Sequence, residues 1–450
     1  EFWALSVPGL AQHKDGPHHA DARLRDRPDN GRPSGNPRRY TWPPDVSREF
    51  ILMADAAADE QARLLLKQLD PTSWPISIDQ LPEGTALVGG AVRDAFLGRH
   101  NPHPDLDLVV RSDALRHSAR LAKTFGGKHV VLDEQRDIAR LVLNGWTIDV
   151  ARQEGDCLEE DLWRRDYSLN AIALPLQPIA PLCDPTGGLE DLKQGRLRAV
   201  SEQNLIDDPL RLLRGLRFLA EIPLVLDAQT GEWIQRHHQV LVESAPERIL
   251  AELQRLVKGP HADQALQYLE HWPLLQPWAT TSHAVATHDT TLLNATEEAV
   301  ALPLARLTNL ISDDGLKRLK ASKLLQQRCA RLRHWSLHMK QQPEALPEQE
   351  RLQLHLELEA DLAALILGLP NGLQQQWLKR WRDPNDPLFH PTMPLDGGSL
   401  QKELGLSAGP TMGKVLAQLR LEQAFGRIQT RDEALKTAHR LSAEIEAVCD

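Results

Sequence analysis

Between residues 84 and 175 the chain carries a series of short β-rich runs, and from about Asp184 onward every strong periodic signal is helical. The runs are ALVGG, LDLVV, KHVVLD, IARLVL and WTIDVA, and one helical stretch from Ala114 to Phe125 lies among them. Beyond them, apolar residues recur at spacings of three and four as far as the C-terminus. This order predicts an α+β protein in which a small mixed-sheet head is followed by an all-helical neck, body and tail.

Composition divides the chain further. The first 48 residues are rich in Pro, Gly, Asp, Arg and His and have no usable period, so we expect them to be disordered. A helical pattern begins near Phe50 and closes near Pro71, ahead of the first β-rich run. The predicted divisions are a disordered segment 1–48, a head with its preceding helix 49–182, a helical neck 183–262, and a helical body and tail 263–450.

Several classes of protein are disfavoured by composition. No apolar run approaches the roughly 18 residues that would span a bilayer, and the first residues lack a basic segment followed by an apolar one, so we expect no membrane association and no signal peptide. The four cysteines form no CxxC pair, which argues against a metal cluster and favours a reducing cytoplasm. A net charge of −10 excludes a surface coated in nucleic acid but leaves room for a local basic groove.

Two carboxylates interrupt one of the hydrophobic strands. In DLDLVV, Asp105 and Asp107 are expected on one face of a strand and Leu106 and Leu108 on the other, because side chains alternate along a strand. Two ionised carboxylates repel each other unless a cation lies between them, and a hard divalent ion such as Mg²⁺ prefers oxygen ligands. An exposed edge strand with two solvated aspartates would give the same pattern, so the pair alone does not establish a metal site.

The neighbouring residues strengthen the functional interpretation. Gly89 and Gly90 end a strand and open a helix, where backbone N–H groups and the helix dipole favour an anion. Arg93 on the first turn could reach a triphosphate or could form a salt bridge to Asp94 or Asp105. Asp149, in WTIDVAR, is a candidate third catalytic carboxylate, although a solvated aspartate at a strand end would give the same sequence pattern.

Three further stretches carry a family resemblance. They are RRDYSLNAIAL (164–174), DPTGGLEDL (184–192) and DDPLRLLRGLRF (207–218). With LVGGAVRDAFLGRHNPHPDLDLVV (87–110), and in this order, they resemble the class II tRNA nucleotidyltransferases and bacterial poly(A) polymerases. The resemblance covers about residues 84–260 and is weaker beyond, although residues 395–416 are similar to the tail of these enzymes. It implies a polymerase-β-like head with a five-stranded sheet, Mg²⁺ as cofactor, and transfer of nucleotides from CTP, and possibly ATP, to the 3′ end of tRNA.

The resemblance also implies roles for individual residues. Asp105 and Asp107 would bind the metal, and Arg165, Asp166 and Asn170 would contact the ribose. Asp208 and Arg211 would form a protein template for the incoming base, and Asp207 would orient Arg211. Arg214, which shares the helix face of Arg211, would also bind the nucleotide. From the residues alone, Asp208-Pro209 is a helix start with Asp208 as N-cap, and the arginines are equally typical of a basic helix face. Glu247 and Arg248 are expected to brace helices, and Gly187-Gly188 to form a turn.

The stretch between the last head strand and the RRD motif is short. Only residues 153–158 separate Arg152 from the acidic turn at Glu159, where CCA-adding and A-adding members carry a flexible loop. Within the family such a deletion resembles the CC-adding enzymes, which stop before the final A. A full CCA-adding or A-adding enzyme and a poly(A) polymerase stay open, as does a non-catalytic RNA-binding relative.

The helical C-terminal half favours an extended RNA over a small acceptor molecule. We expect cationic side chains of this half to contact the RNA backbone rather than its sequence. The candidates are Lys317, Arg318, Lys320, Lys323, Arg328, Arg331 and Arg333, and a solvated helix face is the competing interpretation for each. The pair His288-Asp289 lacks the further His and Asp spacing of a metal-dependent phosphohydrolase.

Overall fold

The computed structural model describes residues 57–99, 101–280, 288–339, 342–405 and 407–449. The predicted disorder of residues 1–48 and the helix start near Phe50 fall outside these residues. The described part of that helix is α2 (Ala58–Leu69), which packs against α3 (Gly90–Phe96). The domain divisions predicted at 49–182, 183–262 and 263–450 stay predictions. Among the described residues no helix combines the length and the apolar character that a bilayer crossing needs.

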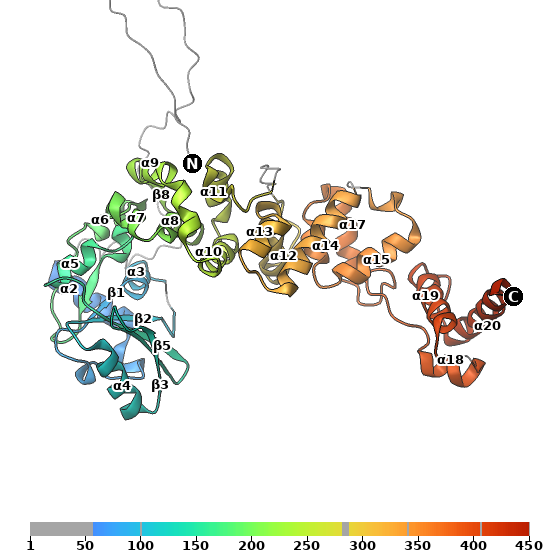
Figure 1. The fold of residues 1–450 in the computed structure, drawn as a ribbon, viewed down its shortest axis with the longest axis horizontal. Coiled ribbons are helices and arrows are strands. Elements are labelled where there is room, and N and C mark those ends of the chain that lie inside the picture. Colours follow the sequence, from blue (N-terminus) through green and yellow to red (C-terminus); the bar gives the residue numbers. More distant parts are fainter. Residues whose placement is uncertain (1–56, 100, 281–287, 340–341, 406, 450) are drawn as a thin grey trace, which may run out of the picture. The chain divides into compact units, whose positions relative to one another are not determined.

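The head is built on a six-stranded mixed sheet (Figure 1). Its strand order is β3-β4-β5-β2-β1-β6, in which only β2 and β5 are parallel neighbours. Each of the five β-rich runs forms a strand, and a sixth strand, which the family resemblance did not imply, pairs with β1 at the sheet edge. The strands are β1 (Ala86–Val88), β2 (Leu106–Val110), β3 (Lys128–Asp133), β4 (Ile138–Leu143), β5 (Trp146–Arg152) and β6 (Ala173–Pro175).

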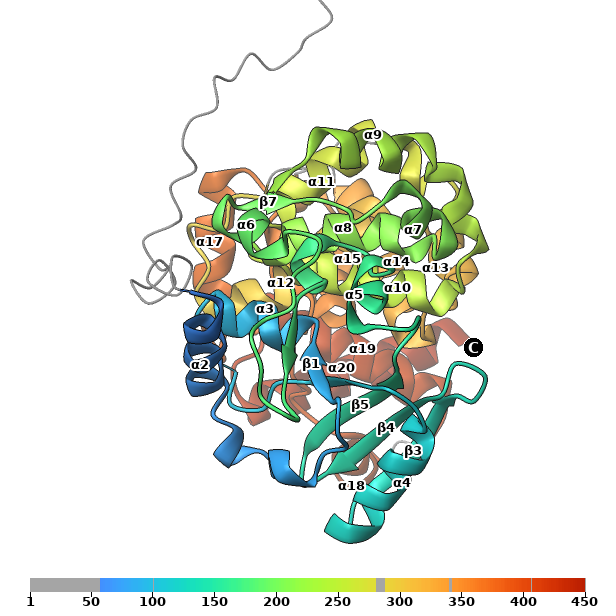
Figure 2. The ribbon, with the colours of Figure 1, turned by 90° about the vertical axis from the view of Figure 1, so that its left-hand side faces the viewer.

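The sixth strand was missed because it is too short to show a period. It has three residues, ends in proline, and its backbone pairing with β1 extends the sheet without any alternation of polar and apolar side chains. The predicted helix at 114–125 is confirmed as α4 (Ala114–Phe125), which packs against β3, β4 and β5 (Figure 2).

The two faces of the sheet are covered differently. Alternate residues of the strands, among them Leu106, Leu141 and Ile148, are buried in the main core on the side of α4. On the other face, Val109 of β2 lies in a separate small cluster with Leu162 of α5 (Leu158–Trp163). This small cluster covers β1, β2 and β6 on that face. The aspartates predicted to be catalytic lie beside it.

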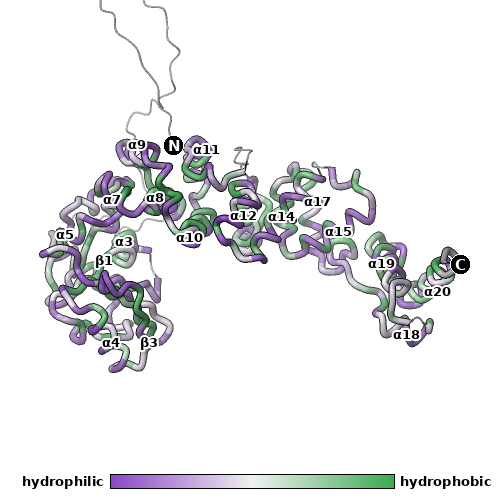
Figure 3. The backbone as a smooth tube through the Cα atoms, viewed as in Figure 1, coloured by the Kyte–Doolittle hydropathy of each residue, from purple (hydrophilic) through white to green (hydrophobic). Residues whose placement is uncertain are grey.

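The remainder is helical, with one short parallel pair of strands. β7 (Arg196–Leu197) and β8 (Val225–Leu226) lie in the neck predicted to be all-helical, and at two residues each they are too short for a periodic signal. Along the helices hydrophobic and hydrophilic residues alternate at short intervals (Figure 3). The helices are α6 (Gly188–Lys193), α7 (Glu202–Asp207), α8 (Leu210–Glu221), α9 (Ala228–Arg236), α10 (Pro246–Lys258), α11 (Ala262–His271), α12 (Ala295–Leu310), α13 (Asp313–Arg318), α14 (Lys323–Met339), α15 (Glu348–Leu358), α16 (Leu362–Ile366), α17 (Asn371–Trp381), α18 (Gly397–Leu404), α19 (Pro410–Ala424) and α20 (Arg431–Cys449).

Helix α8 is the buried centre of the neck. It packs against α10 and α11, and four of its five leucines, Leu212, Leu213, Leu216 and Leu219, have no exposed surface. The Tyr167 ring packs edge-on against Phe218, and the Tyr167 hydroxyl donates a hydrogen bond of 2.8 Å to the Arg211 carbonyl. The RRD stretch of the head is thereby fixed to the helix that carries Arg211.

The glycine pair of DPTGG forms the turn that the sequence predicts. Gly187 has φ +74°, a left-handed conformation that only glycine adopts without strain, and α6 begins at Gly188. The Asp184 carboxylate closes the turn by accepting hydrogen bonds from the N–H groups of Gly188 and Leu189 at 2.7 and 2.9 Å.

Candidate active site

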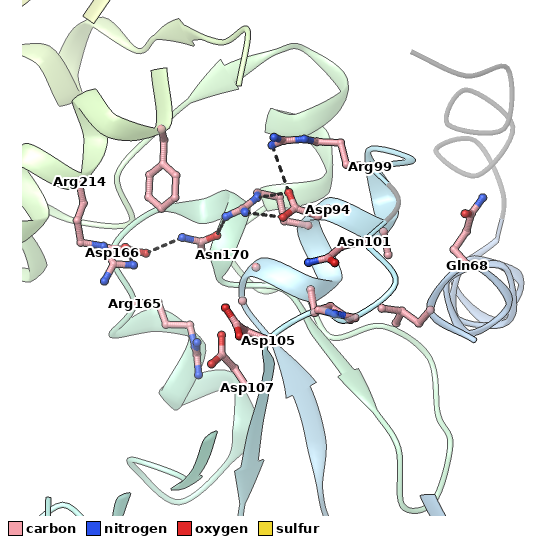
Figure 4. A pocket seen from close by; sticks show the side chains of 18 of the residues that line it. Gln68, Asp94, Arg99, Asn101, Asp105, Asp107, Arg165, Asp166, Asn170 and Arg214 are labelled. Atoms are coloured by element: carbon pink, nitrogen blue, oxygen red, sulfur yellow. Dashed lines mark hydrogen bonds and ion pairs between the residues drawn. The ribbon is translucent and has the colours of Figure 1, made fainter. Parts of the chain in front are cut away.

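A cavity of about 580 Å³ opens at the end of the sheet where β2 begins. Helices α3 and α8 and the RRD stretch line it (Figure 4). Most of the predicted site residues meet there, although they come from segments more than 100 residues apart. Asp149 and Asp207 do not line it. The predicted residues that do are Gly89, Gly90, Arg93, Asp105, Asp107, Arg165, Asp166, Asn170, Asp208, Arg211 and Arg214.

The two predicted metal-binding carboxylates both face the cavity (Figure 4). Asp107 lies on β2 between Val88 of β1 and Asp149 of β5, whereas Asp105 precedes the strand by one residue and is not part of it. Neither carboxylate has a hydrogen bond or an ion pair within the part of the chain that the structure describes. Burial, reinforced by the negative charges of Asp149 and Asp105, raises the pKa of Asp107 to about 6, although Arg165 lowers it in part.

Asp149 is held by an arginine. The Arg140 guanidinium on β4 donates two hydrogen bonds of 2.8 Å to the two Asp149 oxygens, and this ion pair raises the pKa of Arg140. No group of three or more His, Cys, Asp or Glu side chains suited to a metal ion occurs among the described residues. The role of Asp149 as a third catalytic carboxylate therefore stays a prediction, and the protein offers two unpaired carboxylates at the cavity.

The glycine pair between β1 and α3 allows a close approach to Asp107. Gly89 has φ +74°, and a Cβ atom at this position would lie 3.0 Å from Asp107 Oδ2. Any other residue would therefore push against the Asp107 carboxylate and adopt a strained backbone. The first turn of α3 begins at Gly90 and faces the same cavity.

Arg93 is buried at 7% exposure and is engaged by protein groups. Its guanidinium donates to both oxygens of Asp94 at 3.0 and 2.9 Å and to Asn170 Oδ1 at 2.7 Å. Arg99 reaches the same Asp94 carboxylate at 3.5 Å (Figure 4). The alternative role considered for Arg93, an ion pair with Asp94, is confirmed, and the arginine also fixes the amide of Asn170.

Asp166 is the buried carboxylate of the site. Its Oδ1 accepts hydrogen bonds from the Tyr167 N–H at 2.8 Å and from the Asn170 amide at 3.3 Å. Its Oδ2 lies 2.9 Å from Arg214 Nη2, an ion pair that is not aligned as a hydrogen bond, so this oxygen lacks a hydrogen-bond donor. Burial opposes ionisation, but Arg214, Arg211 and the two hydrogen bonds hold the pKa of Asp166 below its usual range.

The residues of the predicted base template are positioned differently from the expectation. Asp208 is not the N-cap of α8, which is Pro209, although its carboxylate accepts a 3.3 Å hydrogen bond from the Leu210 N–H. The role of Asp207 in orienting Arg211 stays a prediction; its carboxylate accepts a hydrogen bond from Gln203, and among the described residues it acts on Arg211 through its charge and not through a hydrogen bond. That carboxylate belongs to the last residue of α7 and bonds back along its own helix, one turn earlier.

Two other contacts position the template. Arg211 Nη1 donates to the backbone carbonyls of Arg164 and Asn204 at 3.0 and 2.9 Å. The Asp208 carboxylate forms a 3.0 Å ion pair with Arg248 of α10. Arg248 was expected to brace helices, and it does so through a residue of the template itself.

The sequence matches two family descriptions. Residues 85–198 match the Poly A polymerase head domain, and residues 224–279 match the probable RNA and SrmB-binding site of polymerase A. A CC-adding tRNA nucleotidyltransferase of Synechocystis is 30% identical over 82% of this chain and 96% of its own length. A CC-adding tRNA nucleotidyltransferase of Thermus thermophilus is 32% identical over 78% and 92%. This chain belongs to the tRNA nucleotidyltransferase and poly(A) polymerase family.

Two further similarities widen the range of specificities among its relatives. An A-adding tRNA nucleotidyltransferase of Deinococcus radiodurans is 37% identical over 43% of this nucleotidyltransferase and 44% of the relative. A Thermotoga maritima CCA-adding enzyme, solved in complex with tRNA, superposes with a TM-score of 0.62 at 22% identity, covering 89% of this chain and 98% of that one. The structural similarity supports the fold, whereas nucleotide specificity differs among the relatives.

The linker between β5 and α5 of the nucleotidyltransferase comprises residues 153–157. The Glu154 N–H donates to Asp161 at 3.1 Å, and the Glu154 carboxylate pairs with Arg136 at 2.6 Å and also with Arg164. The Arg164 carbonyl in turn accepts from Arg211. The linker is therefore bound at both its backbone and its side chains next to the template.

Several residues that support the site gave no signal in the sequence. Arg140, the partner of Asp149, was not singled out because this pairing between neighbouring strands becomes visible only in three dimensions. Asp161 binds Arg165 at 2.9 Å, and this pair could have been found from its spacing of four residues on a helical turn.

The predicted basic surface of the nucleotidyltransferase is partly engaged within the protein. Lys320 pairs with Glu247, and Arg328 pairs with Asp361, each at 2.6 Å. Lys317, Lys323 and Arg331 have no ion pair or side-chain hydrogen bond within the described residues, so these three stay the stronger candidates. Of the remaining two, Arg318 donates to the Pro277 carbonyl and Arg333 pairs with Asp313.

Proposed function

We propose that the chain adds CMP residues from CTP to the 3′ end of tRNA, releases pyrophosphate, and stops after the second C. The observation that carries the proposal is the contrast among the aspartates that line the cavity. Asp70, Asp94, Asp166 and Asp208 accept hydrogen bonds from, or pair with, neighbouring groups. Asp105 and Asp107 have no such partner among the described residues. An unpaired carboxylate pair in a cavity is suited to a cation brought from solution.

The donor set fits Mg²⁺. Asp105 and Asp107 supply hard oxygen ligands, and the pKa of Asp107 is raised first by burial and then by the negative charges of Asp149 and Asp105, which Arg165 and Arg214 offset only in part. Mg²⁺ commonly takes one or two carboxylates and completes its shell with water and substrate phosphates, which agrees with the absence of a third unpaired carboxylate in the described cavity. Bound metal would lower the pKa of the attacking hydroxyl and neutralise charge on the triphosphate.

The nucleotide would lie between α3 and α8. The backbone N–H groups of Gly89 and Gly90, at the start of α3, would donate to the triphosphate, while Arg93 holds Asn170 in place. Asp166 would accept from a ribose hydroxyl through Oδ2, the oxygen that lacks a hydrogen-bond donor. A site that hydrogen-bonds the 2′-hydroxyl favours ribonucleotides over deoxyribonucleotides.

Asp208 and Arg211 would read the base. A carboxylate accepts from the exocyclic amino group of C or A, and a guanidinium donates to a ring nitrogen or carbonyl. Neither U nor G offers the same order of donors and acceptors. The Arg248 ion pair on Asp208 and the two carbonyls on Arg211 set the positions of both groups before the base arrives.

The short linker supports the restriction to C. Residues 153–157 are tied down by Glu154 and Asp161, and Glu154 pairs with Arg164, whose carbonyl holds Arg211. Because the template is held in this way, no flexible segment next to it would shift Asp208 and Arg211 from binding C to binding A. The restriction predicts that CTP is used twice and ATP is refused.

A primer-extension assay tests the proposal. One tRNA transcript ends at the discriminator base and another ends in CC, and each is offered CTP and ATP with Mg²⁺. Growth of the first by two C and no growth of the second is the expected result. Addition of A to the CC-ended tRNA would overturn the restriction and establish a CCA-adding or A-adding enzyme, and long A tails would establish a poly(A) polymerase.

A further inference from the structure

The sheet face that carries Asp107 continues across three neighbouring strands. Asp107 pairs with Asp149 of β5, Asp149 with Arg140 of β4, and Arg140 with Val130 of β3. Residues paired across neighbouring strands point to the same face, and strands lie about 4.8 Å apart. The row therefore extends about 15 Å sideways from the catalytic carboxylate to the edge of the sheet.

A second row runs parallel to the first and begins one strand later. Thr147 of β5 pairs with Val142 of β4, which pairs with Lys128 of β3. We name the five outward residues of both rows the open strip; they are Lys128, Val130, Arg140, Val142 and Thr147.

The open strip is uncovered, and its chemistry is mixed. Helix α4 packs on the opposite face of β3 and β4, and α5 covers the part of the sheet at β1, β2 and β6. Val130 is 46% and Val142 39% exposed, and Lys128 is exposed as well. Arg140 is 43% exposed and binds Asp149 through Nε and Nη2, so its Nη1 has no hydrogen-bond partner among the described residues.

The direction of attack points to what occupies the open strip. Phosphoryl transfer requires the attacking oxygen and the leaving pyrophosphate to lie roughly in line on opposite sides of the reacting phosphorus. Under the proposed function the triphosphate lies on the β1–α3 side of Asp107, at Gly89 and Gly90. The attacking 3′-hydroxyl then approaches from the β5 side, where the next residues of the sheet are Asp149 and Arg140.

We propose that the open strip binds the last nucleotides of the RNA strand that is being extended. Arg140 and Lys128 contact its phosphates, and Val130 and Val142 support the faces of its bases. Two cations flanking exposed apolar side chains match a single strand, which presents phosphates on one side and unstacked bases on the other. The inference rests on the proposed function and extends it to the acceptor strand.

Substitutions at Val142 and Lys128 test the proposal, because neither residue belongs to the nucleotide site. Val142→Glu and Lys128→Glu place a negative charge on the open strip. Each is expected to raise the KM for tRNA about tenfold and to leave the KM for CTP within about twofold. Val131→Glu is the matched control, since Val131 is an exposed valine of β3 that pairs with Ala139 and points to the opposite face of the sheet, and it is expected to change neither constant.

A salt titration adds a readout that a structural defect would not move. Lys128→Gln is expected to reduce the slope of log Kd for tRNA against log salt by about 0.7, the value for one phosphate contact on a single strand. Unchanged tRNA constants in all three strip variants would overturn the proposal. A loss of self-association in these variants, with normal tRNA constants, would instead assign the open strip to a second copy of the chain.

Crosslinking separates this inference from the proposed function. A tRNA transcript carrying 4-thiouridine as its 3′-terminal nucleotide is irradiated with the full-length protein in the absence of CTP. A crosslink within residues 128–147 is the expected result, and crosslinks only elsewhere would overturn the placement. Because this readout needs no catalysis, an enzyme that failed to add CMP would contradict the proposed function and leave the strand placement to be judged on its own.

Discussion

Asp107 should destabilise the folded protein when it is ionised, and Asp107→Asn tests this directly. Its pKa rises from the ordinary 3.8 to about 6, first because of burial and then because of Asp149 and Asp105. At about 1.4 kcal/mol per pKa unit, this rise corresponds to about 3 kcal/mol as an upper limit. The folded protein binds this proton more tightly than the unfolded chain, so the cost is present in full above about pH 6. It disappears as the pH falls below 3.8.

The asparagine variant removes the charge and keeps the shape. We therefore expect Asp107→Asn to be inactive and, without metal, more stable than the parent by up to about 3 kcal/mol at pH 8. Urea unfolding in EDTA at pH 8 and pH 4 measures both values, and the difference should shrink at pH 4. Asp59→Asn, at an exposed position of α2, is the control that should change little. A destabilised Asp107→Asn, or a gain that is the same at both pH values, would refute the electrostatic reasoning.

Four further predictions follow from the same contacts. Arg214→Gln leaves the buried Asp166 carboxylate without its cation and should cost about 3 kcal/mol in urea unfolding, whereas Asp166→Asn with Arg214→Gln should recover part of it. Arg211→Ala should lower kcat/KM for CTP about 100-fold and raise the fraction of UTP incorporated in competition assays. Chelation by EDTA should abolish CMP addition, and added Mg²⁺ should restore it. Glu154→Gln should loosen the linker and allow measurable addition of A to a CC-ended tRNA.

The strands and the two unpaired aspartates were predictable because their signals are local. Four of the β-rich runs form strands of five to seven residues and ALVGG forms a strand of three, and the DLDLVV alternation sends Asp107 to one face and Leu106 and Leu108 to the other. The alternation failed at Asp105, which lies just outside the strand, because a terminal residue has no further strand pairing to define its place. The β6 pairing was missed because three residues cannot show a period.

The partners of the site residues were not predictable, because they come from distant segments. Arg93 meets Asn170, which is 77 residues away, and Asp208 meets Arg248, which is 40 residues away. Neither distance corresponds to a helical or strand spacing, so no periodicity argument reaches them. Of the partners assigned by proximity in sequence, Asp94 for Arg93 was confirmed, whereas the Asp207 carboxylate bonds to Gln203 and not to Arg211. Neighbours along a chain point in different directions once α7 ends and α8 begins.

These partners add what the sequence does not contain, namely which aspartates of the site are already paired. The carboxylates compared are those at positions 94, 105, 107, 149, 166 and 208. The structure gives arginine partners to four of them, Asp94, Asp149, Asp166 and Asp208. A carboxylate paired with an arginine is already neutralised and gains little from a metal ion, whereas an unpaired one in a cavity is stabilised by it. The distribution of arginines, more than the aspartates themselves, therefore directs a divalent cation to Asp105 and Asp107.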